Sequence, residues 1–327
     1  MNKQNKKIYT ALMNRIAIAL MLNQGVMAVL GLVLSTMEER LGKGSILVLL
    51  GECIMYCIGF SVPIFVFNRM NNNAEREIYE PKENEKMPPI QTVFSLFVAL
   101  GGTILASYLN GFLVGIFGNY SDFTAEFFWK AELDTVPQIV MYFVYIAVIP
   151  AFVEEYLFRW TICKNLAVYG KPTAIIASAI LFSLMHANIE QILYTFVAGV
   201  LLAWVYLETK NIAFPILIHF LNNGISAIGD IINARLGEKA SDMYLAYTDA
   251  IILILTIISA IGLGIYFKKK GRLIEKTVLK PDENGNEVAL LSIQERVSGF
   301  FSIGIVLFTA YSLTTMIGLV LLSLIYG

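Results

Sequence analysis

Charged residues are scarce in this sequence: Asp, Glu, Lys and Arg make up 15% of its 327 residues, whereas 57% are hydrophobic. A soluble domain carries about 25% charged and about 45–50% apolar residues, because its surface must be solvated. The charges present nearly cancel, with 24 Lys and Arg against 25 Asp and Glu. The scarcity excludes an ordinary soluble domain, and the balance excludes the basic surface of a nucleic-acid-binding protein. The composition predicts a protein that spans a membrane several times.

Cysteine and histidine are also rare. The three cysteines, Cys53, Cys57 and Cys163, are too few for a disulfide framework or a four-cysteine zinc site. No internal repeat is visible, which argues against a transporter built from inverted repeats. The two histidines of the chain, His186 and His219, both lie in apolar segments. Placing an ionisable side chain in such a segment costs free energy, so it suggests a function.

Apolar segments long enough to cross a bilayer need about 20 residues. Nine segments approach that length, so we expect an all-α polytopic membrane protein with eight or nine transmembrane helices, the segment at 173–187 being short. The expected spans are 16–34, 46–67, 90–117, 136–153, 173–187, 189–207, 212–229, 247–267 and 299–325.

Lys and Arg in the short loops predict the orientation of these spans. Four basic residues precede the first span, and basic residues recur in every second loop, ending with a cluster at 268–280. The intervening loops carry few, for example Lys130 alone at 118–135. We therefore expect a multi-pass cell-membrane protein whose N-terminus is cytoplasmic.

Three regions follow from this organisation. Residues 1–89 hold the first two spans and a polar cytoplasmic linker, 90–230 form the membrane core, and 231–327 hold the last two spans. The last region includes a polar cytoplasmic insert at 268–298. Within it, Asn284-Gly285 between two strand-like stretches predicts a small β-hairpin near 277–291.

Ionisable and amide side chains gather in three of the expected spans. An ionisable group within a span costs about 3 kcal/mol on insertion scales and marks a functional site by default. The residues are Glu154, Glu155, Arg159, Phe182, His186, His219 and Asn223.

Helical spacing says which of these side chains cooperate. Glu155 can reach Arg159 four residues later, and this pair is explained by structure alone. Glu154 points about 100° away and has no local partner. Phe182 is expected to be a packing partner of His186, and each histidine taken singly could be a core residue. Packing alone does not explain why these polar side chains occur together in three spans.

The three motifs Glu-Glu-x-x-x-Arg, Phe-x-x-x-His and His-x-x-x-Asn, in this order, resemble the CAAX-protease and bacteriocin-processing family of intramembrane endopeptidases. The family includes the Rce1-type prenyl-protein proteases and the Abi proteins linked to bacteriocin self-immunity. All seven motif residues match, and the resemblance covers about 136–229, under a third of the chain.

The resemblance implies a mechanism. Glu154 would activate a water with the help of His186, and His219 and Asn223 would stabilise the oxyanion. Glu155, Arg159 and Phe182 would support the site. The cleaved bond would lie near the cytoplasmic membrane face, because Glu154 falls just after the expected span 136–153. The substrate would be a peptide or protein, such as a bacteriocin, a pheromone or a CAAX-like protein.

Two alternatives stay open at this stage. Two histidines and a glutamate could hold zinc, although no His-Glu-x-x-His motif is present, so we expect a metal-independent protease without a cofactor. A non-catalytic immunity or transport protein could use the same polar cluster for binding. Membrane lipid is an expected partner, and an accessory subunit or a homo-oligomer is left open.

Overall fold

The structure, a computed structural model, describes residues 2–42, 44–72, 86–115, 133–271, 279–281 and 287–326. Within this part of the chain, eight helices are long and apolar enough to cross a membrane. The predicted all-α polytopic fold is therefore confirmed. The segment expected at 173–187 forms a shorter apolar helix, Lys171–His186, which accounts for the uncertainty between eight and nine spans.

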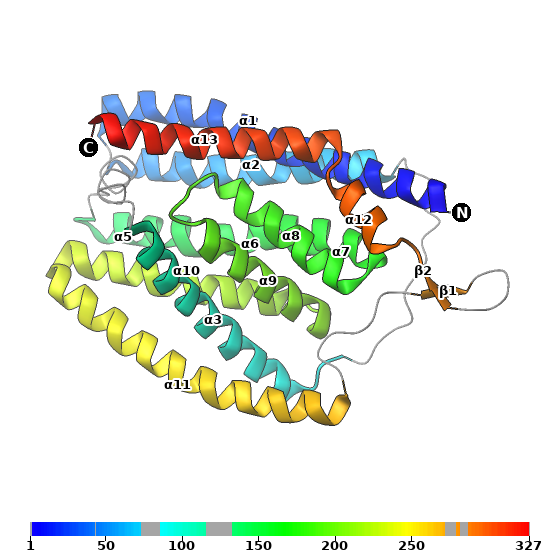
Figure 1. The fold of residues 1–327 in the computed structure, drawn as a ribbon. Coiled ribbons are helices and arrows are strands. Elements are labelled where there is room, and N and C mark those ends of the chain that lie inside the picture. The colour runs from blue at the N-terminus through cyan, green and yellow to red at the C-terminus, as the bar shows by residue number, and fades with distance from the viewer. Residues whose placement is uncertain are drawn as a thin grey trace.

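The elements lie along the chain as long helices that run alternately in opposite directions, with Val136–Tyr169 forming one helical run (Figure 1). They are α1 (Asn2–Leu41), α2 (Ile46–Asn72), α3 (Pro89–Gly115), α5 (Val136–Phe143), the π-helix η1 (Val144–Val148), α6 (Ile149–Glu155), the π-helix η2 (Tyr156–Cys163), α7 (Lys164–Leu166), the 3₁₀-helix η3 (Ala167–Tyr169), α8 (Lys171–His186), α9 (Ile192–Thr209), α10 (Ala213–Leu236), α11 (Glu238–Lys270), β1 (Leu279–Pro281), β2 (Glu287–Ala289), α12 (Ile293–Phe300) and α13 (Ile303–Tyr326).

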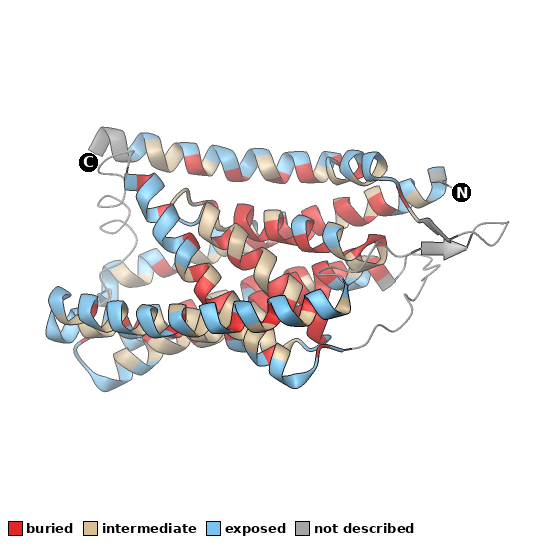
Figure 2. Ribbon diagram, turned by 60° about the horizontal axis from the view of Figure 1, so that its bottom comes forward, coloured by how far each residue is buried: buried red, intermediate tan, exposed pale blue. Residues whose placement is uncertain are grey.

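The helices form layers around a central group. α1 pairs with α2 and α13 on one side, while α11 packs on α3 and α10 on the other. The helices of the centre, η2, α8 and α9, lie between these layers. Figure 2 shows that buried residues concentrate in the central helices, whereas α13 is largely exposed. The centre of the bundle is thus the place where a polar side chain is hidden from both lipid and water.

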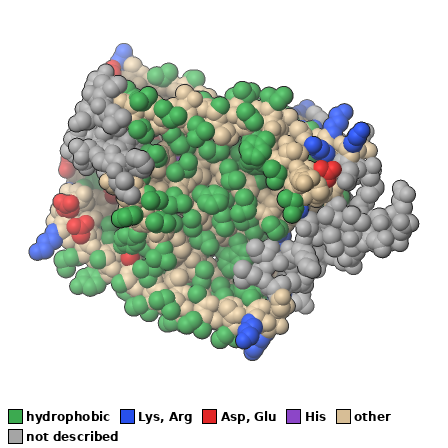
Figure 3. Space-filling model, in the orientation of Figure 1, with side chains coloured by type: hydrophobic (Ala, Val, Ile, Leu, Met, Phe, Trp, Pro, Cys, Tyr) green, Lys and Arg blue, Asp and Glu red, His purple; other side chains and the backbone are tan. Residues whose placement is uncertain are grey.

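The outer surface fits a lipid environment. α11 exposes a row of large aliphatic side chains, which are unfavourable in water and favourable in the hydrocarbon of a bilayer. They are Ile251, Ile254, Ile257, Ile258, Ile261 and Ile265. In Figure 3, hydrophobic side chains cover the middle of one face and charged side chains appear toward its ends. The molecule therefore has an apolar band of the kind that a membrane requires.

Close helix contacts depend on small residues. A Cβ added at Gly199 of α9 would lie 2.9 Å from the Cα of Ala179 in α8. A Cβ added at Gly101 of α3 would lie 2.0 Å from the Thr256 Oγ1 of α11. Small residues let membrane helices approach closely, where packing and hydrogen bonds hold them together. α8 and α9 thereby form a tight hairpin in the core.

The predicted hairpin is present. β1 and β2 pair antiparallel, with Leu279 opposite Ala289 and Pro281 opposite Glu287. The predicted turn at Asn284-Gly285 lies outside the described residues, as do 73–85 of the polar linker and 116–132 of the loop before α5.

Candidate active site

The two neighbouring glutamates at the end of α6 point in different directions. Glu154 and Glu155 are both buried, with 2% and 0% of their surface exposed. Glu154 lines a large internal cavity, while Glu155 turns to Arg159 and His219. The prediction that the two carboxylates serve different contacts is confirmed.

Glu155 joins two motifs. Its Oε2 lies 3.0 Å from the Nε of Arg159, one helical turn later, which is the predicted ion pair. Its Oε1 accepts a hydrogen bond of 2.8 Å from the Nδ1 of His219 in α10. A carboxylate only accepts, so the Nδ1 of His219 carries a proton and the Nε2 faces the other way. The contact with His219 could not be predicted from helical spacing.

Glu154 meets two groups from distant helices. Its Oε1 accepts a hydrogen bond of 2.5 Å from the hydroxyl of Tyr56 in α2. Its Oε2 lies 4.0 Å from the Nε2 of His219. Tyr56 was not among the candidate residues, since nothing in the sequence around it sets it apart from the other tyrosines of the chain. The Glu154 carboxylate is therefore held on one oxygen and open on the other.

His186 and Phe182 lie one turn apart at the end of α8. The Nδ1 of His186 lies 2.8 Å from the carbonyl of Phe182 and donates to it, so the Nε2 is left for the cavity. The ring of Phe182 stands edge-on to His186 and His219, at centroid distances of 4.8 and 6.2 Å. The guanidinium carbon of Arg159 lies 4.6 Å from the same ring centroid. Phe182 is thus more than a partner of His186: its ring contacts both histidines and the Arg159 guanidinium.

Asn223 is placed by a proline. Pro150 has no N–H for the carbonyl four residues back, and the helix widens to a π-turn there. That carbonyl belongs to Ile146, and the Nδ2 of Asn223 donates to it at 3.1 Å. Asn222 in turn donates to the Oδ1 of Asn223 at 3.2 Å, which fixes the orientation of the amide. Asn222, which sequence reasoning did not select, is therefore part of the site.

The cavity has a volume of about 720 Å³ and collects the predicted residues. Glu154, Phe182, His186, His219 and Asn223 all line it, whereas Glu155 and Arg159 do not. Its other polar lining includes the hydroxyls of Thr103, Tyr145 and Tyr194. The structure records no hydrogen bond between Glu154 and His186 among these described residues, and both line a cavity that is large enough for a water and a substrate group. The arrangement can activate a water next to a bound amide.

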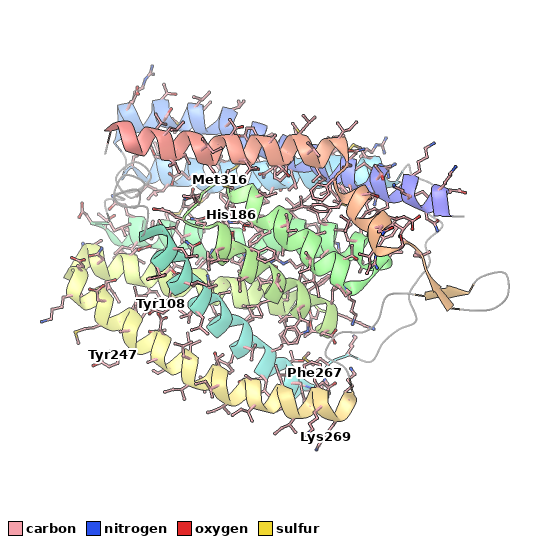
Figure 4. All side chains as sticks on the ribbon, in the orientation of Figure 1. Tyr108, His186, Tyr247, Phe267, Lys269 and Met316 are labelled. Carbon is pink, nitrogen blue, oxygen red and sulfur yellow. The ribbon has the colours of Figure 1, made fainter. Side chains whose placement is uncertain are left out.

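The helical run that carries Glu154 is longer than the predicted span. The helical run that begins at Val136 does not end at residue 153 but continues to Tyr169. Glu155 and Arg159 form an ion pair inside the bundle, so their charges do not end the helix. Glu154 therefore lies near the middle of this helical run, and its position relative to the membrane faces stays a prediction. The cavity extends to Tyr108, toward the end of the bundle away from the N-terminus (Figure 4).

Within the residues that the structure describes, no group of three or more His, Cys, Asp or Glu side chains is arranged to hold a metal ion. The Nδ1 atoms of both histidines are bonded to protein acceptors.

Comparison with known proteins gives the class. Residues 136–225 match the family model described as Type II CAAX prenyl endopeptidase Rce1-like. The matched range contains all seven motif residues. The resemblance drawn from the motifs is confirmed: over these residues the chain is similar to the Rce1-like family of CAAX prenyl endopeptidases.

Two curated proteins are similar. The membrane-embedded CAAX protease MroQ of Staphylococcus aureus (strain USA300) is 31% identical over 112 residues, which are 32% of this chain and 45% of that protein. The putative membrane peptidase YdiL of Bacillus subtilis (strain 168) is 25% identical over 169 residues, 50% of this chain and 66% of that protein. The chain thus spans less than two thirds of either relative. No solved structure matches it significantly.

Proposed function

We propose that the protein is an intramembrane endopeptidase in which Glu154 activates a water for attack on a peptide carbonyl. The observation that carries the proposal is the open Oε2 of Glu154, in a cavity shared with both histidines of the chain. The Rce1-like domain supports the reaction class. A peptide or protein is the substrate, and a bacteriocin, a pheromone or a CAAX-like protein fits the resemblance.

Glu154 and His186 act on the water. The Oε2 of Glu154 takes a proton from the water, and the water oxygen bonds to the carbonyl carbon of the substrate. The Nε2 of His186 faces the cavity because its Nδ1 is held by the carbonyl of Phe182. It orients the water by accepting its second hydrogen. The proton on Glu154 then passes to the amide nitrogen as the carbon–nitrogen bond breaks.

His219 and Asn223 stabilise the oxyanion. His219 keeps its Nδ1 on Glu155 and presents its Nε2 to the cavity, where the oxyanion forms. Asn223 has two amide hydrogens and uses one on Ile146, which leaves one for the substrate. Removing one such donor typically lowers the rate by about 10²–10³-fold. No step needs a metal ion, so we propose a metal-independent glutamate protease.

A comparison of peptides tests the function. We expect membranes of cells that express the protein to contain peptide fragments absent from cells that lack it. Mass spectrometry of small peptides, followed by cleavage of the identified precursor with purified protein, checks this. Identical peptide profiles, with a phenotype that persists without any fragment, would favour a non-catalytic immunity or transport protein.

We also propose that the N-terminus is cytoplasmic. Lys3, Lys6 and Lys7 begin α1 at the end of the bundle where Lys268–Lys270 end α11 (Figure 4). Basic residues favour the cytoplasmic side. The cavity, which extends to Tyr108, then reaches toward the end of the bundle on the outer side of the membrane.

Cysteine labelling tests the orientation. In a Cys57→Ala background, which removes the exposed cysteine, an impermeant maleimide added to intact cells should label Tyr247→Cys but not Lys269→Cys. These residues lie at opposite ends of α11 (Figure 4). Permeabilised cells serve as the control in which both variants react. The reverse pattern in intact cells would contradict a cytoplasmic N-terminus.

A further inference from the structure

A residue outside the Rce1-like match contacts the central carboxylate. The hydroxyl of Tyr56 donates a hydrogen bond of 2.5 Å to the Oε1 of Glu154, across 98 positions of sequence. Tyr56 belongs to α2, whereas the match begins at residue 136. The first helical hairpin is therefore part of the site and not only a neighbour of it.

The ring of Tyr56 is held on two sides. It stacks on Phe60, one turn later in α2, with a centroid distance of 5.1 Å and an angle of 21°. It also meets the edge of Tyr145 in η1 at 5.9 Å and 89°. Phe60 is itself buried, and α2 packs against α6, which carries Glu154. A supported ring presents its hydroxyl in one place, which is what a positioning group needs.

This contact decides which oxygen of Glu154 is free. Without a donor, a carboxylate rotates about its last torsion with little preference between its two oxygens. The bond to Tyr56 fixes the Oε1 and leaves the Oε2 on the side of the His219 Nε2, 4.0 Å away. The His186 ring lines the same cavity. The Oε1 of Glu154 is thus held by Tyr56, and the Oε2 is left to react with the water.

We propose that Tyr56 is a positioning residue that selects the Oε2 of Glu154 as the proton acceptor. The inference rests on the proposed function, because it assigns a role within that reaction. It predicts that the catalytic unit includes α2, and that residues 136–225 alone lack a group that the reaction uses.

Replacing Tyr56 by phenylalanine tests the role. Tyr56→Phe keeps the ring and its stacking and removes only the donor. A hydrogen bond to a charged group contributes enough free energy for its loss to lower kcat by roughly 10- to 100-fold. KM should stay unchanged, because the hydroxyl bonds Glu154 and not the substrate. The matched control is Tyr142→Phe, whose hydroxyl bonds a different carboxylate, Asp230, at 2.7 Å. It should leave kcat and KM as they are.

A spectroscopic measurement follows the bond itself. The infrared difference between the wild type and Glu154→Gln isolates the Glu154 carboxylate bands. These bands should shift in Tyr56→Phe and stay in place in Tyr142→Phe, because only the first change removes their donor.

The outcomes separate the two proposals. Cleavage by the wild type with unchanged kcat in Tyr56→Phe, or unmoved carboxylate bands, would overturn the role of Tyr56 and leave the proposed function standing. A wild-type protein that cleaves no peptide would overturn the proposed function, and the catalytic role of Tyr56 with it.

Discussion

Replacing Glu154 by glutamine is expected to lower kcat for peptide cleavage by about 10²–10⁴-fold, the usual contribution of a general base. Glutamine has nearly the same shape, so it fills the same place at the end of α6 and still offers an oxygen to the Tyr56 hydroxyl. It cannot take a proton from water at the position of the Oε2. The protein should therefore fold and bind substrate but not cleave it.

The measurement is single-turnover cleavage by purified protein in lipid vesicles, with folding checked by size-exclusion chromatography. Glu52→Gln is a matched control, since Glu52 is a buried carboxyl of α2 that does not line the cavity, and it should cleave normally. A chelator should leave the wild-type rate unchanged. Wild-type cleavage by Glu154→Gln would refute the mechanism, and loss of cleavage in chelator would point to a metal.

The fold could be predicted well because a bilayer imposes one rule on every span. Each span must be apolar and about 20 residues long, and each expected segment corresponds to an observed helix or helical run. The rule failed at one boundary. The expected span at 136–153 stopped at two glutamates, whereas the helix continues to Tyr169. The four-residue spacing predicts the pair of Glu155 with Arg159, but a count of apolar residues still treats both as charges that end the span.

The site could be predicted in part. The three motifs supplied the groups that line the cavity, because each pattern is local to one helix. Tyr56 and Asn222 could not be found in this way. Tyr56 reaches Glu154 only because α2 packs on α6, and a contact across 98 positions leaves no periodic signal. Asn222 resembles any amide that joins membrane helices until its bond to Asn223 is seen.

Replacing Arg159 by alanine is expected to destabilise the fold by about 3–5 kcal/mol, because it removes the cation of a buried ion pair and leaves the Glu155 carboxylate with His219 as its remaining partner. Arg159 is 1% exposed and Glu155 is 0% exposed, so water cannot replace the lost cation. The bond from the His219 Nδ1 to Glu155 would remain. Resistance to unfolding by sodium dodecyl sulfate measures the change.

The partner variants separate stability from chemistry. Glu155→Ala instead leaves the buried Arg159 without its carboxylate partner, so it should also reduce the yield of folded protein. The double variant Glu155→Leu with Arg159→Met should regain stability, since an apolar pair of similar volume often replaces a buried ion pair without loss. It should still cleave poorly, because His219 loses the acceptor that holds its Nδ1. A folded but inactive Glu155→Ala would instead place Glu155 in the chemistry, and wild-type stability in Arg159→Ala would show that the ion pair does not support the fold.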